Sequence, residues 1–227
     1  MITINLVDDE PLIRAGLAAL INAEPDMEVT GQAADGADVP DLVRRTRPDL
    51  VLMDVRMPGL DGIQATHTLQ RTPHPPRVIV VTTFDNDDHV WGALRAGAHG
   101  FLLKRTPPEE ILAAVRLAHR GDTLLFPTAL RALAATQPAH PTPAARAVST
   151  LTQREAQTLT LIAQGLTNAE IATHLHLGIQ TVKTHVSNTL TKLGVRDRTQ
   201  AVIAAYDSGL IRPGTRPPKP TTHPRNH

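Results

Sequence analysis

The first 121 residues alternate short apolar runs with stretches of helical spacing. The apolar runs show little alternation of polar and apolar positions, which is typical of strands buried on both faces. Five strands are predicted, at residues 2–7, 27–33, 49–55, 77–83 and 99–104. Apolar residues recur every three or four positions in the stretches that follow them, so helices are predicted at residues 11–23, 39–47, 63–71, 87–98 and 108–121. Five repeats of strand and helix predict an open parallel sheet covered by helices on both sides, a doubly wound α/β domain.

The pattern changes after Gly121. Residues 122–147 have room for one short helix, and an Ala-, Pro- and Thr-rich segment around residues 136–150 predicts a linker. From Leu151 to Leu210 no strand is predicted, but four short helices are, at residues 152–165, 167–177, 179–194 and 198–209. The expected organisation is an α/β domain at 1–121, a linker at 122–147, a small all-α domain at 148–211 and a basic, Pro-rich tail at 212–227 with the composition of a disordered segment.

The net charge of +1 conceals an asymmetry between the two halves. Residues 1–121 carry 12 Lys and Arg against 17 Asp and Glu, a net charge of −5, whereas residues 122–227 carry 11 against 5, a net charge of +6. An acidic front half suits a metal ion, and a basic rear half suits a polyanion such as nucleic acid. No apolar run reaches membrane-spanning length, the first ten residues are too acidic for a signal peptide, and cysteine is absent. A soluble, cytoplasmic protein without disulfides or a membrane partner is expected.

Polar side chains stand at the ends of four predicted strands. Asp8 and Asp9 end the first strand, Asp54 lies near the end of the third, and Thr82 and Lys104 end the fourth and fifth. Parallel strands bring these ends to one edge of the sheet. Three carboxylates there repel each other unless a cation joins them, and such a set of oxygen ligands suits Mg²⁺. Because Lys104 and Thr82 face the same point, the edge is predicted to bind a phosphoryl group, with Asp54 as the attacking carboxylate.

The segments VDDE, LMDVRMPGLDG, VVTTFD and AGAHGFLLK resemble the receiver domain of bacterial two-component response regulators, over roughly residues 1–121. The resemblance implies a flavodoxin-like sheet and phosphorylation of Asp54 by a partner histidine kinase. The implied site residues are the Mg²⁺ ligands Asp9, Asp54 and the backbone carbonyl of Arg56, with Asp8 acting through water, and the phosphoryl-binding or switch residues Thr82, Phe101 and Lys104. Phe101 stands where the family often has a switch tyrosine, so a hydrogen bond from that hydroxyl is not expected here.

Residues 168–194 contain two short helices separated by a tight turn near Gly178, which is the spacing of a helix-turn-helix. On the second helix, apolar residues recur from Val182 to Leu193 and leave a polar face on the other side. From LTQRE to RDRTQAVIAAYDSGL the chain resembles the LuxR-type output domain of NarL/FixJ response regulators. The resemblance implies that the helix Ile179–Leu193 enters the major groove of double-stranded DNA. The implied contacts are Lys183, Thr184 and Ser187 nearest the bases, with His185, Lys192, Arg196 and Arg198 at phosphates.

The last predicted helix carries Val202, Ala205 and Tyr206 at helical spacing. Part of this stripe belongs to the core, and the exposed remainder resembles the two-fold interface of the family. A homodimer on phosphorylation is therefore implied, with two recognition helices at half-sites about one DNA turn, roughly 34–36 Å, apart. In the unmodified protein, the acidic receiver is expected to rest against the basic recognition helix.

Two other functions stay open at this stage. An aspartyl-phosphate phosphatase on a similar sheet would need a second acid two residues after its nucleophile, and Arg56 occupies that position. A DNA-binding regulator that is never phosphorylated would not need the receiver residues, all of which are present. The sequence favours a non-enzymatic transcriptional regulator whose partners are a histidine kinase, double-stranded DNA and a second copy of itself.

Overall fold

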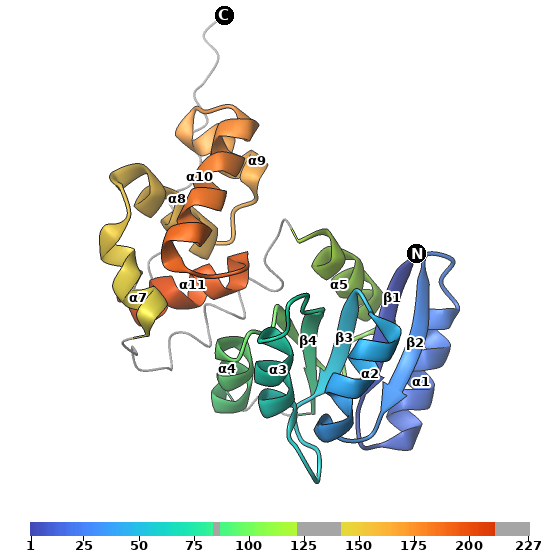
Figure 1. The fold of residues 1–227 in the computed structure, drawn as a ribbon. Coiled ribbons are helices and arrows are strands. Elements are labelled where there is room, and N and C mark those ends of the chain that lie inside the picture. Colours follow the sequence, from blue (N-terminus) through green and yellow to red (C-terminus); the bar gives the residue numbers. More distant parts are fainter. Residues whose placement is uncertain (84–86, 122–141, 212–227) are drawn as a thin grey trace, which may run out of the picture.

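The structure, a computed structural model, describes residues 1–83, 87–121 and 142–211 (Figure 1). Its N-terminal part is a five-stranded sheet in the order β2-β1-β3-β4-β5, in which every neighbouring pair is parallel. The strands are β1 (Ile2–Val7), β2 (Met27–Ala33), β3 (Leu50–Asp54), β4 (Arg77–Thr82) and β5 (Gly100–Leu103). Each strand begins and ends within one residue of its sequence prediction, so the predicted doubly wound sheet is confirmed.

Helices cover both faces of the sheet (Figure 1). The helices α1 (Pro11–Asn22) and α5 (Pro108–Arg120) pack on one face, and α2 (Val39–Thr46), α3 (Gly62–Gln70) and α4 (Asp87–Arg95) pack on the other. All five residues of β3 are buried between the two layers, which explains its continuous apolar sequence. Strand order reverses between β1 and β3, and a ligand site is expected in the crevice at their C-terminal ends.

The loop after β3 requires glycine where α3 begins. The carboxylate of Asp61 accepts a hydrogen bond from the Gln64 N–H at 2.7 Å and caps the helix. The N–H of Gly62 donates to the Val55 carbonyl at 3.0 Å, so α3 starts directly over the end of β3. A Cβ atom on Gly62 would lie 1.9 Å from the carbonyl oxygen of Asp54. Gly62 therefore allows the close approach that fixes the backbone around Asp54.

The C-terminal domain contains the four helices that periodicity predicted. They are α8 (Gln153–Ala163), α9 (Asn168–Leu175), α10 (Ile179–Leu193) and α11 (Arg198–Asp207). Capping boxes begin α8 and α9, and His176 ends α9 in the left-handed conformation with φ of 54°. The short connection to α10 makes α9 and α10 a helix-turn-helix. With 15 residues α10 is the longest described helix, and no helix in the described ranges could cross a membrane.

One further helix lies in a segment that was expected to be linker. The helix α7 (Pro143–Ala147) continues into the 3₁₀ turn η2 (Val148–Thr150) and packs against α10 and α11. Thr142 caps it through a hydrogen bond from the Ala145 N–H at 3.0 Å. Periodicity misses α7 because five residues hold little more than one turn. The short helix expected earlier in the linker and the tail at 212–227 lie outside the described residues.

The two domains pack against each other through α4 and α11 (Figure 1). One cluster of buried apolar residues runs from the α2–α4 side of the sheet into the C-terminal helices. The rings of Trp91 and Tyr206 meet edge to face, with centroids 6.5 Å apart and planes at 74°. The Arg95 guanidinium lies 5.6 Å from the centre of the Trp91 ring and 2.7 Å from an Asp207 carboxylate oxygen. The side of α11 that faces the sheet domain is therefore covered.

Substitution of Gly62 tests the close approach at the end of β3. We expect Gly62→Ala to lower the free energy of unfolding by about 1–3 kcal/mol, because the added methyl group must displace the Asp54 carbonyl. Gly16 in α1 has nothing within 4 Å of its missing Cβ. Gly16→Ala should therefore raise stability by about 0.5–1 kcal/mol. Urea denaturation measures the free energy of unfolding of both variants. If Gly62→Ala is as stable as Gly16→Ala, the described packing around Gly62 is contradicted.

Candidate functional site

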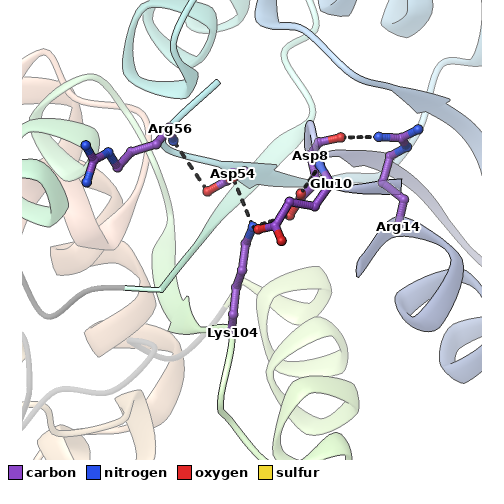
Figure 2. Close-up of polar contacts among 6 residues, drawn as sticks. All are labelled: Asp8, Glu10, Arg14, Asp54, Arg56 and Lys104. Atoms are coloured by element: carbon purple, nitrogen blue, oxygen red, sulfur yellow. Dashed lines mark hydrogen bonds and ion pairs between the residues drawn. The ribbon is translucent and has the colours of Figure 1, made fainter. Parts of the chain in front are cut away.

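Three carboxylates and one lysine meet at the C-terminal edge of the sheet (Figure 2). The Lys104 ammonium lies 2.8 Å from Asp8 Oδ2, 2.9 Å from Glu10 Oε1 and 3.0 Å from Asp54 Oδ2. An ammonium has three N–H donors, so each carboxylate can take one. The structure thus brings Asp8, Asp54 and Lys104 together, as the strand ends predicted. The sequence pattern does not predict Glu10 at this site, because an acid that follows two others is typical of a solvated surface.

Backbone contacts fix the position of this cluster. The N–H of Glu10 donates to Asp8 Oδ1 at 2.9 Å, and the Arg14 guanidinium on α1 donates to the Asp8 carbonyl (Figure 2). On the other side, the Lys104 N–H donates to the Thr82 carbonyl at 2.8 Å and ties the end of β5 to β4. The side chains therefore meet because the register of the parallel strands places their ends together.

Burial and charge act against each other in the cluster. Burial is the largest influence on Asp54 and raises its pKa. The Lys104 ammonium lowers the pKa of Asp54, and the negative charge of Asp8 raises it. Together these effects leave the pKa of Asp54 above its usual value. Burial alone would lower the pKa of Lys104, but hydrogen bonds to Asp8, Glu10 and Asp54 raise it well above its usual range. Lys104 therefore stays charged at neutral pH and acts as an internal cation among the acids.

The carboxylates also fit a divalent metal ion. One oxygen atom from each of Asp8, Asp9 and Asp54 lies within 4.8 Å of the other two. Asp9 is half-exposed, and no side-chain hydrogen bond or ion pair engages it within the described ranges. The N–H of Arg56 lies 3.4 Å from Asp54 Oδ1, while its side chain points away from Lys104 (Figure 2). Hard oxygen donors in this number suit Mg²⁺.

Thr82 ends β4, and Phe101 lies on β5, the strand against which α4 packs. Thr82 is buried at the end of β4, where it pairs with Leu103 of β5. Phe101 is partly buried and pairs with Val80. Its ring packs against the apolar cluster that contains Trp91 of α4 and continues into α11. Packed side chains therefore join Phe101, on the strand that leads to Lys104, to the contact between the domains.

The side chains expected at DNA bases lie on α10. Lys183, Thr184 and Ser187 are exposed, and His185 is partly buried. The Thr184 hydroxyl donates back to the Gln180 carbonyl at 3.0 Å, as threonine often does within a helix. These residues form a polar face on α10 opposite the buried Val182. Their contact with DNA stays a prediction.

The cations expected at DNA phosphates have partners within the protein. Lys192 Nζ lies 2.7 Å from Glu155 Oε2. This contact, followed by hydrogen bonds from Thr152, lowers the pKa of Glu155 to about 2. Arg198 is 6% exposed and donates to the Leu166 carbonyl and to the Asn168 side chain. Arg196 is exposed and donates to the Gln70 carbonyl at the end of α3. Burial of Arg198 was not foreseen, because arginine is usually a surface residue.

The stripe expected to form a dimer interface is covered in this conformation. Val202 and Ala205 are fully buried, and Tyr206 is 7% exposed because it packs on Trp91. The expectation that part of this stripe is exposed is therefore wrong for this conformation. No local sequence pattern predicts the contact between Trp91 and Tyr206. The one available signal is that Trp91 is the single tryptophan in a chain with 2% aromatic residues.

Polar side chains near the start of α11 also hold the domains together. The Thr199 hydroxyl donates to the His99 carbonyl at 3.0 Å, and the Gln200 amide donates to the Leu94 carbonyl at 2.6 Å. His99 Nδ1 accepts the Val78 N–H at 3.2 Å, while Nε2 lies 3.5 Å from an Asp197 carboxylate oxygen. Burial lowers the pKa of His99, although Asp197 opposes that shift.

Comparisons with known proteins agree with this geometry. Residues 4–116 match the family described as response regulator receiver domain, and residues 149–205 match bacterial regulatory proteins of the luxR family. The chain is 42% identical to the transcriptional regulatory protein LiaR of Bacillus subtilis over 93% of this chain and 100% of LiaR. It is 38% identical to the response regulator VraR of Staphylococcus aureus over 93% and 99% of the two chains. The solved structure of the response regulator ChrA, from a heme-sensing two-component system, matches 92% of this chain and 98% of its own, with 34% identity and a TM-score of 0.51.

The raised pKa of Asp54 predicts a pH-dependent stability difference. A carboxyl group whose pKa is higher in the folded state destabilises the fold once it ionises, so the cost is absent below its unfolded pKa and complete above its folded pKa. Asp54→Asn should therefore raise the free energy of unfolding at pH 7, and the gain should shrink as the pH falls toward 4. Urea denaturation at several pH values measures this difference.

Asp41→Asn is the control, because Asp41 pairs with Arg44 on the surface, with both side chains more than 60% exposed. Its effect should stay within about 0.5 kcal/mol at every pH. A loss of stability in Asp54→Asn at pH 7 would contradict the described balance of burial and charge.

Proposed function

We propose, because this chain belongs to the DNA-binding transcriptional response regulators with a receiver and a LuxR-type domain, that Asp54 accepts a phosphoryl group from a partner histidine kinase. The main support is the position of Asp54 at the end of β3, with the Lys104 ammonium 3.0 Å from Oδ2 and Asp9 beside it. A nucleophilic carboxylate, a fixed cation and further acidic oxygens are the groups that phosphoryl transfer needs. The modification would then alter DNA binding by the second domain.

The chain's own residues supply most of the proposed chemistry. An Asp54 oxygen forms a bond to phosphorus while the bond from phosphorus to the kinase histidine nitrogen breaks and the imidazole leaves. Lys104 favours the ionised carboxylate against burial and can then donate to phosphoryl oxygens. Thr82 offers a hydroxyl from the neighbouring strand. Mg²⁺, held by Asp9, Asp54 and the Arg56 carbonyl, with Asp8 acting through water, would supply positive charge that offsets the carboxylates and the phosphoryl group.

The α4 helix is the element that would transmit the modification. It packs on β5, whose end carries Lys104, and on α11 of the DNA-binding domain. When Lys104 turns from Asp8 and Glu10 toward a phosphoryl group, the end of β5 must adjust. Phe101 and Trp91 belong to one packed cluster, so this adjustment would change the surface that α4 presents to α11. The proposed result is separation of the domains.

The unmodified protein would be less active because the α11 stripe is covered and α10 lies beside the receiver. Dimerisation through Val202, Ala205 and Tyr206 needs the surface on which α4 packs. Lys183 and Ser187 line a cavity together with Arg77 of the receiver. A recognition helix must lie unobstructed in the major groove, so the neighbouring receiver would hinder the entry of a duplex. Phosphorylation would free α11 for a homodimer and α10 for two half-sites.

An enzymatic role has less support. A phosphatase that uses an aspartyl phosphate needs an acid to protonate its leaving group, and Arg56 stands two residues after Asp54. Binding to chromosomal DNA and phosphorylation by a kinase both fit a protein that works in the cytoplasm as a regulator.

Mass spectrometry after incubation with Mg²⁺ and a small phosphodonor tests the phosphorylation site. We expect wild type to gain one phosphoryl mass and Asp54→Asn to gain none, because the amide is not a nucleophile. Asp41→Asn, on the exposed surface of α2, should behave as wild type. A normal rate of phosphorylation in Asp54→Asn would refute the assignment.

DNA binding tests the roles of two lysines on α10. Lys183→Ala should reduce discrimination between a selected operator and random DNA by about 1–3 kcal/mol, because the residue is expected at a base. Lys192→Ala removes the same charge from a position that is 40% exposed and paired with Glu155. It should weaken both DNAs alike and flatten the dependence of log affinity on log salt by about one. Equal losses on both DNAs in Lys183→Ala would assign Lys183 to the phosphate backbone instead.

A further inference from the structure

A cavity of about 300 Å³ lies between the two domains beside the recognition helix. Arg77 lines it from the receiver, and Lys183, Ser187, Arg196, Asp197 and Arg198 line it from the DNA-binding domain. We infer that this cavity is a binding site for a small multivalent oxyanion of the phosphate class. The site is separate from Asp54. Arg77 begins β4 and Asp54 ends the neighbouring parallel strand β3, so the two residues lie at opposite ends of the strands.

The charges around the cavity are strongly unbalanced. Among the described residues, four cationic side chains and one carboxylate, that of Asp197, line the cavity. That carboxylate is already used, since one oxygen accepts the Gln200 N–H at 2.9 Å and the other lies 3.5 Å from His99 Nε2. Clefts lined by charges of one sign attract counter-ions, and low-dielectric walls strengthen the attraction. An anion is therefore the ligand that this cavity favours.

Two of the four cations have no charge partner in the described part of the chain. No hydrogen bond or ion pair engages the Arg77 guanidinium or the Lys183 ammonium within residues 1–83, 87–121 and 142–211. Arg196 and Arg198 donate to neutral oxygens, those of Gln70, Leu166 and Asn168. A guanidinium binds two oxygens of a phosphate group side by side, which suits Arg77 to this ligand.

Arg77 is held in place by its surroundings. Its guanidinium packs against Gly121, where a Cβ atom would lie 2.4 Å from one guanidinium nitrogen. Gly121 adopts φ of 75° and ends α5, so the cation lies at the negative end of that helix dipole. Packing of the domains brings this fixed charge to the same cavity as Lys183. Their repulsion disfavours the closed arrangement, and a bound oxyanion would remove that penalty.

The bound anion would hold the protein in the closed conformation. It would engage Lys183 and Ser187, which the proposed function assigns to DNA, and link them to the receiver through Arg77. Binding of the anion and binding of DNA would then exclude each other. This consequence rests on the proposed function, whereas binding of the anion does not.

Calorimetric titration of the full chain with pyrophosphate tests the site. The buffer contains EDTA, so that divalent cations cannot attract anions to the carboxylates around Asp54. Its ionic strength is kept constant throughout the titration. Arg77→Gln should weaken binding about tenfold or more, because a charged hydrogen-bonding partner is lost. Arg77→Lys keeps the charge and should retain part of the affinity. Arg45→Gln, an identical change on the exposed surface of α2 and outside the cavity, should have no effect.

Inorganic phosphate and a nucleoside triphosphate are titrated in parallel. The compound that binds most tightly, with the same dependence on Arg77, identifies the source of the phosphate group. Lys183→Gln provides a second variant on an exposed position and should also weaken binding. Absence of binding at millimolar concentrations of all three compounds would overturn the inference. So would equal affinities in Arg77→Gln, Lys183→Gln and Arg45→Gln.

A DNA-binding measurement separates this inference from the proposed function. Pyrophosphate should weaken DNA binding by wild type more than by Arg77→Gln at matched ionic strength. Equal weakening of both would refute the competition. If the protein binds pyrophosphate through Arg77 but binds no DNA sequence preferentially, the proposed function fails and the anion site stands.

Discussion

The ion cluster around Lys104 is the interaction on which the rest of the structure depends. The sheet brings Asp8 and Asp54 to a buried edge where their negative charges are disfavoured, and Glu10 adds a third. One ammonium at the end of β5 balances them, with contacts of 2.8–3.0 Å. Loss of the Lys104 ammonium would leave these carboxylates uncompensated, which is far more costly than loss of a surface pair. A change of charge on Asp54 therefore alters the contacts of the Lys104 ammonium. Because Lys104 directly follows β5, the end of that strand is expected to move with it.

The contact between the domains is held by packing and opposed by charge. The acidic receiver was expected to attract the basic recognition helix, but the charged residue of the described receiver that shares a cavity with α10 side chains is the cation Arg77. The domains meet instead through Trp91 and Tyr206 and through the ion pair of Arg95 with Asp207. An apolar contact at α11 and repulsion near α10 act in opposite directions. Such a balance lets a modest change in α4 shift the protein between closed and open arrangements.

The sequence predicts what depends on local pattern. The strands and the meeting of Asp8, Asp54 and Lys104 follow from periodicity and from the rule that parallel strands end at one edge. Helix α7 is missed because one turn carries no periodic signal, and the burial of Arg198 is missed because its partners Leu166 and Asn168 lie about thirty residues away. The pairing of residues 91 and 206 depends on how two separately folded units fit together. Sequence periodicity reports which face of an element is apolar, but not which other element covers it.

The most direct test is a distance measurement between the domains before and after phosphorylation. The chain has no cysteine, so spin labels can be placed selectively at Ala113→Cys on α5 and Ala169→Cys on α9, both at exposed positions. Pulsed electron paramagnetic resonance should give one narrow distance distribution for the unmodified protein. Mg²⁺ and a phosphodonor should shift it to longer and broader distances, and Asp54→Asn in the same background should prevent the shift. An unchanged distribution in protein that mass spectrometry shows to be fully phosphorylated would contradict the proposed separation of the domains.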